Sequence, residues 1–205
     1  MTIADQSTLV CNNSSVARTY TLKRRAERQE ETRRRIVEAA IELHRTKGPA
    51  RTTISDIARR AGVQRHTYYR HFPDEVSLGL ACSGLHLERN PPPDAAAWFA
   101  IADLDERRRR GLAELYAWYA ANEEMFAAVM RDAEIDPLVG ELFELRAAEA
   151  MGRIRAALAE GLSGDRRTQA WLDLALDFHA WRRLSRSGLP AEEAAEAMVA
   201  ALGCQ

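Results

Sequence analysis

Cationic and aromatic side chains gather in one short segment, residues 56–72, whose sequence is DIARRAGVQRHTYYRHF. The segment holds four arginines, two histidines and two adjacent tyrosines, placed on either side of a single Ala-Gly-Val tripeptide. Arginine can donate two hydrogen bonds side by side to guanine, and tyrosine or histidine can bond to phosphate oxygens. These residue types at this density predict a surface that binds nucleic acid.

Two short helices joined by a tight turn are predicted to position these side chains. Thr53 can accept a hydrogen bond from the backbone N–H of Asp56, which is the capping pattern of a helix start. Gly62 can adopt the left-handed conformation that closes this helix. A second helix, from Gln64 to His71, follows directly. A helix, a glycine turn and a second helix form the helix-turn-helix motif, whose second helix enters the major groove of DNA.

The side chains around the second helix divide by direction. Val63 and Tyr68 are expected to point inward, against the first helices of the domain. The outward side chains suit base edges at the start of the helix and phosphates toward its end. The predicted base-reading residues are Gln64, Arg65, His66 and Thr67, and the predicted phosphate-binding residues are Thr53, Tyr69, Arg70 and His71.

Positive and negative charge are separated along the chain, although the formal net charge is only -1. Residues 18–72 carry 15 Lys and Arg against 6 Asp and Glu, a net charge of +9, and the remainder carries 14 against 24, a net charge of -10. A basic N-terminal third is the electrostatic footprint of a polyanion-binding domain. Residues 18–28 form a basic arm within it, which either contacts DNA or is a solvated tail.

The chain as a whole is predicted to be all-α, with an N-terminal helix-turn-helix domain followed by a C-terminal helical bundle. Apolar residues recur at three- and four-residue spacing, and no strand pattern is present. The predicted parts are a disordered tail at 1–17, the DNA-binding domain with its basic arm at 18–89, a proline linker at 90–93 and a second domain at 94–205. The long helices are expected over 28–47, 105–122, 138–161, 165–187 and 191–202, with shorter ones over 95–101 and 123–132.

The segment TTISDIARRAGVQRHTYYRHFPDEVSL, Thr52–Leu78, resembles the signature of the tetracycline-repressor (TetR) family of transcription regulators. The shared features are a threonine-led helix, the DIA..AGV pattern, a recognition helix ending in T.Y.HF and a following helix rich in leucine. The resemblance runs from Arg28 through the first four predicted helices. Beyond them, only the helical layout matches the family.

The resemblance implies a homodimer that binds the two halves of a palindromic operator, with an effector-binding and dimerisation domain at 94–205. A small effector is then expected to release a repressor from double-stranded DNA. By the same resemblance, Thr53, Tyr69 and His71 fall on phosphate-binding positions, and Arg65, His66 and Thr67 fall on positions that approach bases. Two residues depart from the family pattern: Gln64 replaces a capping serine, and Glu75 replaces a lysine that contacts phosphate.

Aromatic and sulfur-containing side chains of the second domain could line an effector pocket for an apolar or aromatic ligand. The candidates are Trp98, Trp118, Tyr119, Phe126, Met151, Phe178 and His179, with Glu114 and Tyr116 as further polar groups. Most of these residues are expected to form the core of the bundle instead, because helical bundles need apolar stripes. The alanine-rich last two helices suit contact across a two-fold axis, or packing within one chain.

Cofactor and metal chemistry find little support. Cys11, Cys82 and Cys204 form no CxxC pair, so neither a disulfide framework nor a zinc site is expected. Asp173 and Asp177 lie one turn apart but lack a histidine partner at metal spacing. The sequence also lacks a Gly-rich phosphate loop and a nucleophile elbow, so we expect no enzymatic activity and no cofactor.

Membrane location is not expected either, because no apolar run reaches the length of a transmembrane helix and no secretion signal is recognised. The sequence therefore predicts a cytoplasmic protein. The arginine run 107–110 is interpreted as a hydrated helix flank. The rival to a regulator is a helical small-molecule-binding or adaptor protein without DNA binding, and Glu75 is the residue that favours it.

Overall fold

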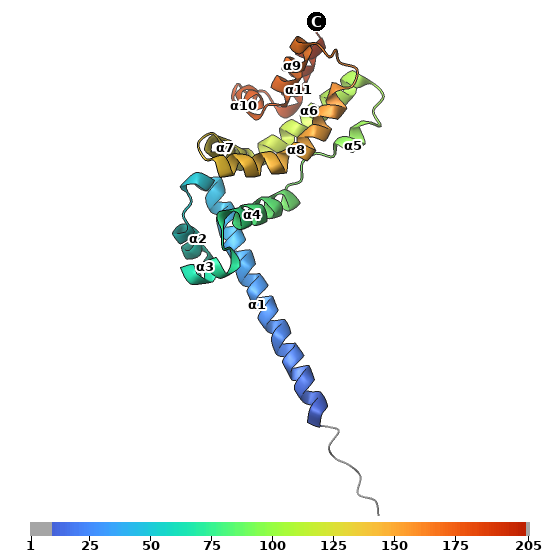
Figure 1. The fold of residues 1–205 in the computed structure, drawn as a ribbon. Coiled ribbons are helices and arrows are strands. Elements are labelled where there is room, and N and C mark those ends of the chain that lie inside the picture. The colour runs from blue at the N-terminus through green and yellow to red at the C-terminus, as the bar shows by residue number, and fades with distance from the viewer. Residues whose placement is uncertain (1–9, 204–205) are drawn as a thin grey trace, which may run out of the picture.

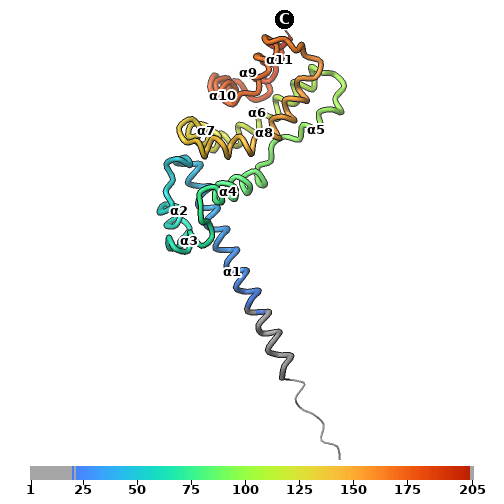
Figure 2. Tube along the Cα trace, in the orientation of Figure 1, coloured from blue at the N-terminus to red at the C-terminus, as the bar shows by residue number. Residues whose placement is uncertain are grey.

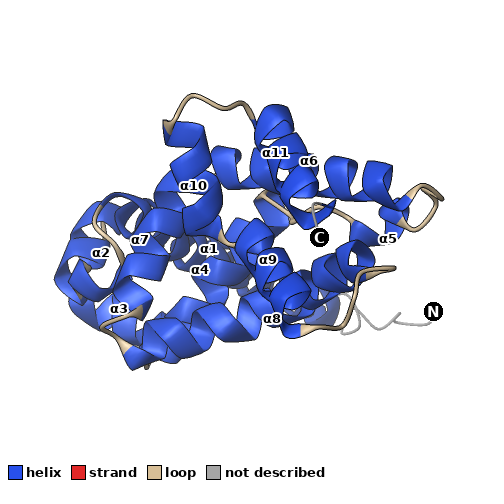
Figure 3. Ribbon diagram, turned by 90° about the horizontal axis from the view of Figure 1, so that it is seen from above, coloured by secondary structure: helices blue, strands red, loops and turns tan. Residues whose placement is uncertain are grey.

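A computed structural model describes residues 10–203, and these residues form helices and turns with no strand among them (Figures 1 and 3). The all-α prediction is confirmed for this part of the chain. The elements are α1 (Val10–Thr46), the 3-10 helix η1 (Pro49–Arg51), α2 (Ile54–Ala61), α3 (Arg65–His71), α4 (Glu75–Arg89), α5 (Ala95–Trp98), α6 (Leu104–Ala121), α7 (Glu123–Ala133), α8 (Pro137–Ala159), α9 (Arg166–Leu176), α10 (Phe178–Arg186) and α11 (Ala191–Gly203).

Helix α1 is longer than the sequence pattern indicates. The pattern predicts a start at Arg28, but the helix begins at Val10, so residues 10–17 of the expected tail are helical. Residues 1–9, the rest of that tail, lie outside the described residues. In Figures 1 and 2 the C-terminal half of α1 packs beside α2 and α4, while the preceding part projects away from the rest of the molecule. Residues 22–30 are all exposed, so much of the basic arm is a bare helix.

The first four helices enclose a core of their own. Its buried members are Ile36, Val37, Ala39, Ala40, Ile57, Ala61, Tyr68, Phe72, Leu78 and Cys82. A second core joins α5, α6, α8, α9, α10 and α11. Its buried members include Trp98, Leu112, Leu115, Tyr116, Tyr119, Ile154, Leu158, Leu172, Phe178, Trp181, Ala194 and Leu202. Helices α7 and α8 lie across α1 and α4 at the junction between the two groups (Figure 1).

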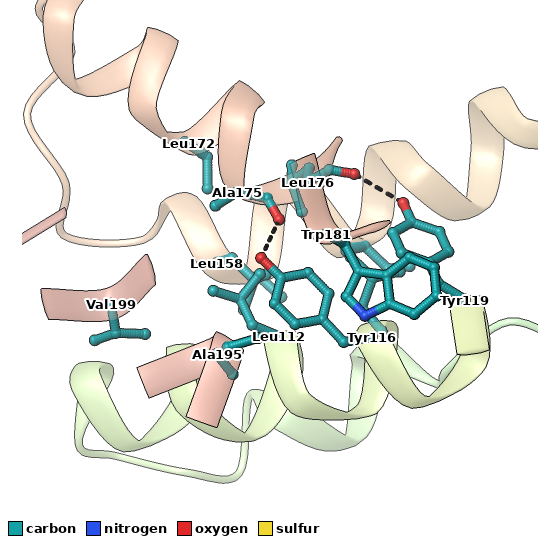
Figure 4. Close-up of a cluster of buried hydrophobic side chains, with 14 of the residues drawn as sticks. Leu112, Tyr116, Tyr119, Leu158, Leu172, Ala175, Leu176, Trp181, Ala195 and Val199 are labelled. Carbon is teal, nitrogen blue, oxygen red and sulfur yellow. Dashed lines mark hydrogen bonds between the residues drawn. The ribbon is translucent and has the colours of Figure 1, made fainter. Parts of the chain in front are cut away.

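The single helix predicted over 165–187 is wrong, because the chain breaks at Asp177 into α9 and α10. The hydroxyls of Tyr116 and Tyr119 donate to the carbonyl oxygens of Ala175 and Leu176, each at 2.7 Å (Figure 4). In a continuous helix those carbonyls would accept from backbone N–H groups four residues later. One of these N–H groups, that of Ala180, donates instead to the Asp177 carboxylate at 2.7 Å, which starts the new helix.

The interpretation of the arginine run as a hydrated flank is wrong for its first two members. Arg107 and Arg108 are 5% and 7% exposed, and both bind carbonyl oxygens around the ends of neighbouring helices. Arg109 and Arg110 face outward and pair with Glu106 and Glu114 on the same helix. Two of the four side chains are therefore structural, because they satisfy backbone groups that the helix ends leave unpaired.

None of the described helices is both long and apolar enough to span a bilayer. Among the cysteines, Cys82 is a buried free thiol, whereas the Cys11 side chain and Cys204 lie outside what the structure describes. The prolines of the expected linker occupy the segment between the end of α4 at Arg89 and the start of α5 at Ala95.

Candidate functional site

Helix α2 begins and ends as the sequence predicts. The Thr53 hydroxyl accepts from the backbone N–H of Asp56 at 3.1 Å and donates to the Asp56 carboxylate at 3.0 Å. Hydrogen bonds from Lys47 and Thr53 hold the pKa of Asp56 below its ordinary value. At the other end, Gly62 has φ 65° and ψ 37°, and the Val63 N–H donates to the Ala58 carbonyl at 2.9 Å. This is the six-to-one bond of a Schellman closure, and it fixes the direction in which α3 leaves the turn.

Helix α3 presents most of the predicted base-reading residues to the outside. Gln64 stands at its N-cap, but its side chain makes no capping bond, as expected for a glutamine in place of a capping serine. Gln64, Arg65 and His66 are exposed, and Thr67 is half-buried with its hydroxyl 3.2 Å from His66 Nε2. The N–H groups of the first turn carry the partial positive charge of a helix N-terminus, which favours a nearby phosphate.

The two adjacent tyrosines of α3 point in different directions. Tyr68 is 1% exposed and belongs to the N-terminal core, whereas Tyr69 is 44% exposed. Their rings meet edge to face with centroids 5.5 Å apart, and the Arg65 guanidinium lies 3.4 Å from the Tyr69 hydroxyl. The predicted inward direction of Tyr68 is confirmed.

A polar hollow lies between the end of α3 and the middle of α1, and no sequence pattern indicates it. It is lined by Ala26, Gln29, Glu30, Arg33, Arg70 and His71. The Arg33 guanidinium stacks 4.9 Å above the Phe72 ring, which brings a cation from α1 beside α3. Burial is the main cause that lowers the pKa of His71, and the charges of Arg70 and Arg33 add to it. The buried Nε2 of His71 has no hydrogen-bond partner among the described residues. The phosphate-binding candidates Arg70 and His71 thus lie close to an additional arginine.

Glu75, whose negative charge disfavours contact with DNA phosphates, is exposed in the first turn of α4. The preceding residue, Asp74, caps this helix by accepting from the Ser77 N–H at 2.6 Å. A carboxylate in a first helical turn is stabilised by the positive end of the helix dipole. Glu75 therefore has a local structural reason to be acidic.

A cavity of about 420 Å³ lies between α1 and α4 on one side and α6 to α10 on the other. Five of the predicted pocket residues line it: Trp118, Tyr119, Phe126, Met151 and Phe178. Trp98 is buried in the second core instead, with its Nε1 donating to Glu114 at 2.8 Å, and His179 is exposed outside the cavity. The hydroxyls of Tyr116 and Tyr119 are both engaged by carbonyl oxygens of α9.

The other wall of the cavity comes from the N-terminal helices, and sequence reasoning missed it. Ile41 and His44 of α1 line it together with Cys82 and His86 of α4. Cys82 Sγ lies 3.7 Å from His44 Nδ1, and burial raises the pKa of the thiol to about 11. Burial lowers the pKa of His44 to about 4, although the Asp132 carboxylate opposes this shift. Both groups are uncharged at neutral pH, so this wall of the cavity carries no charge at His44 or Cys82.

Acid should therefore destabilise the folded protein through His44. Its pKa is about 4 in the folded chain and ordinarily 6.5, so the unfolded state binds a proton first as the pH falls. From this shift we expect about 2 kcal/mol of unfolding free energy to be lost between pH 8 and pH 5. Urea unfolding across this range should show a shallower pH dependence for His44→Gln, with the exposed His66→Gln as control. Equal slopes for His44→Gln and the unaltered protein would contradict this assignment.

Comparison with known proteins bears on both parts of the site. Residues 36–81 match the sequence profile described as "Bacterial regulatory proteins, tetR family". The transcriptional regulator TtgR of Pseudomonas putida is 44% identical over 57 residues, which are 28% of this chain and 27% of TtgR. SrpR, also of Pseudomonas putida, is 38% identical over 85 residues, which are 38% of this chain and 40% of SrpR. The chain thus aligns with less than half the length of these curated relatives.

Solved structures extend the likeness to the fold of most of the chain. A HlyIIR mutant protein superimposes with a TM-score of 0.63 at 15% identity and covers 86% of this chain and 100% of its own. A TetR family transcription regulator from Marinobacter aquaeolei VT8 has a TM-score of 0.56 at 21% identity, covering 86% of this chain and 97% of its own. The C-terminal helices therefore share an arrangement with these proteins at low sequence identity.

Proposed function

We propose that this chain is a DNA-binding transcriptional regulator of the TetR family, and that it acts as a repressor that binds a palindromic operator as a homodimer and is released by a small apolar or aromatic effector. The observation that carries the DNA-binding part is the α2–Gly62–α3 unit, which holds Arg65, His66 and Tyr69 outward from a packed core. The basic charge of residues 18–72 supports the same conclusion. Enzymatic activity is not a property of this family.

The effector part of the proposal rests on the position of the cavity. Its walls belong to both proposed domains, 18–89 and 94–205, which the linker at 90–93 connects. A ligand there would touch α1 and α4 directly, and α1 packs against α2, which in turn packs against α3. Apolar side chains make most of the wall, and aromatic and methionine side chains are among them, which favours an apolar or aromatic effector.

The dimer is proposed from the two-fold symmetry of palindromic DNA, whose half-sites lie ~34 Å apart and need two linked readers. Helix α11 buries Ala194, Ala195 and Val199 against the second core and leaves Ala197 and Ala200 exposed. Small exposed side chains allow a second helix to approach closely. Sedimentation at several protein concentrations would test for a dimer.

A gel mobility shift with the DNA upstream of the protein's own gene tests the repressor proposal. We expect a complex that weakens steeply with salt and survives non-specific competitor DNA. Arg65→Ala should relax the preference at one base position, whereas Tyr69→Phe should weaken binding equally on all sequences. The absence of a salt-sensitive complex with any palindrome would favour the second candidate, a small-molecule-binding or adaptor protein, for which Glu75 is the supporting residue.

The basic arm is expected to contribute to DNA affinity through phosphate contacts. Deleting residues 1–25 removes four cations: Arg18, Lys23, Arg24 and Arg25. Because each neutralised phosphate contributes about 0.9 to the slope of log K against log salt, we expect that slope to fall by up to about 3 to 4. A variant with Lys23, Arg24 and Arg25 replaced by Gln retains the helix length and should reproduce most of the loss. An unchanged affinity and slope in both variants would show that the arm is only a solvated tail.

A further inference from the structure

The C-terminal end of α7 makes a buried polar contact with the backbone that joins α1 to α2. The Asp132 side chain is fully buried, and its Oδ2 accepts from the Ala50 N–H at 3.0 Å. Its other oxygen, Oδ1, accepts from Arg131 Nε at 2.8 Å, and Arg131 Nη2 donates to the Lys47 carbonyl at 2.9 Å. We call Arg131 and Asp132, with residues 47–50, the α7 latch.

The side chains of Asp132 and Arg131 pack directly against the backbone at Gly48, which leaves no space there for a side chain. Gly48 is buried and has φ 96°, and a Cβ atom at this position would collide with Asp132 and Arg131. The Gly48 carbonyl accepts from the Thr52 hydroxyl at 2.7 Å, and the next residue, Thr53, caps α2. The latch therefore fixes the point at which the helix-turn-helix motif begins.

The same helix that ends in the latch forms one wall of the cavity. Met125, Phe126, Val129 and Met130 of α7 line the cavity on one side, and His44 of α1 lines it on the other, one turn before Lys47. A molecule that fills the space between α7 and α1 must press on both walls within a turn of the latch. A buried carboxylate loses much of its stabilisation when its partners move away. The contact between Asp132 and Ala50 is therefore expected to be either fully formed or lost, because a partly stretched contact is unfavourable.

We propose that the Asp132 carboxylate is the positioning group through which occupation of the cavity reaches the start of α2 and, through it, the reading helix α3. The proposal deepens the proposed function and rests on it, because it presumes that the cavity takes an effector. The latch is a second connection between the cavity and the helix-turn-helix motif, separate from the cavity wall that α4 forms. It acts on residues 47–53, which lie outside α4.

Substitutions of Asp132 test the latch without knowledge of the effector. Asp132→Ala should weaken binding to operator DNA, selected in vitro with the unaltered protein, by about tenfold, within the usual range of coupling between sites. It should also speed hydrogen exchange of the Ala50 amide. Operator affinity and Ala50 exchange of Asp132→Asn should lie between those of the unaltered protein and of Asp132→Ala, since the asparagine amide oxygen can still accept from the Ala50 N–H. The control is Asp165→Ala, which removes the N-cap of α9 and its bonds to Arg167 and Thr168, far from residues 47–50 in the chain. It should lower stability without changing operator affinity or Ala50 exchange.

Filling the cavity from α7 imitates an effector. Val129→Trp, or Val129→Phe if the tryptophan prevents folding, should also weaken operator binding and speed exchange at Ala50. Adding Asp132→Ala to either variant should cause little further loss, because both changes act through one contact.

The possible outcomes separate the latch from the proposed function. Unchanged operator affinity for Asp132→Ala, at a temperature where circular dichroism shows the protein folded, would overturn the latch while leaving the repressor intact. Fully additive losses in the double variant would overturn it too. If the unaltered protein selects no DNA, the proposed function fails. Exchange at Ala50 in the Val129 variants then still decides the latch, which requires faster exchange.

Discussion

Tyr68→Ala is expected to unfold the DNA-binding domain, while Tyr69→Ala is expected to leave it folded but poorly able to bind DNA. Tyr68 is 1% exposed, and its ring lies 6.1 Å from that of Phe72 within the core that α1 and α2 share with α3. Truncating a large buried aromatic side chain removes apolar contacts and leaves a cavity, which costs about 3–5 kcal/mol. That loss is a large part of the stability of a typical domain.

Tyr69 is 44% exposed, so its truncation removes little packing and should change stability by only about 0.5 kcal/mol. Its hydroxyl is a candidate donor to a DNA phosphate, and losing a hydrogen bond to a charged group costs about 1.5–3 kcal/mol of binding. Thermal unfolding followed by circular dichroism, together with DNA titration, measures both quantities. If the two variants lost stability equally, the direction assigned to the adjacent tyrosines would be wrong.

Arg108→Ala is expected to destabilise the C-terminal bundle by about 1–3 kcal/mol, since leaving buried backbone carbonyls without hydrogen-bond donors carries a cost of this size. The Arg108 guanidinium donates to the carbonyls of Leu158 and Glu160 at 3.2 and 2.5 Å, and to the Asp105 carboxylate at 2.7 Å. Removing it leaves the last carbonyls of α8 without these donors, in a place that water reaches poorly.

The neighbouring Arg109→Ala is the matched control for Arg108. Arg109 has 42% of its side chain exposed and pairs with Glu106 one turn away, so its loss should cost at most about 0.5 kcal/mol. Arg108→Lys should be intermediate, because a lysine ammonium cannot reproduce the planar fork of donors. Urea denaturation distinguishes the three variants. Similar midpoints for the Arg108 and Arg109 variants would contradict the structural role of Arg108.

Features of the helix-turn-helix motif could be predicted because their determinants are local. The Thr53 cap spans three residues, and the closure at Gly62 joins Val63 to Ala58, five residues earlier. The outward position of Tyr69 and the inward position of Tyr68 follow from helical periodicity against an apolar first helix. Hydrogen bonds and spacings of such short range can be predicted from the sequence. The all-helical character of the described chain could be predicted in the same way.

Features of the second half depended on residues far apart in the sequence. The break at Asp177 requires Tyr116 and Tyr119, whose hydroxyls bind carbonyls 59 and 57 residues away. The burial of Arg108 requires the end of α8, 50 residues further on. In both cases the helical pattern predicted a simpler structure: one continuous helix over 165–187, and a hydrated arginine run at 107–110.

The sequence by itself therefore determined the two short helices of the helix-turn-helix motif, the Thr53 cap and the Gly62 turn, because neighbouring residues specify these. The packing of α7 and α8 on α1 and α4 decided the rest. It brought His44 and Cys82 into the wall of the cavity and buried Asp132 against Ala50, 82 residues away. Such contacts depend on how helices meet across a core, and no local pattern encodes which side chains will face each other there.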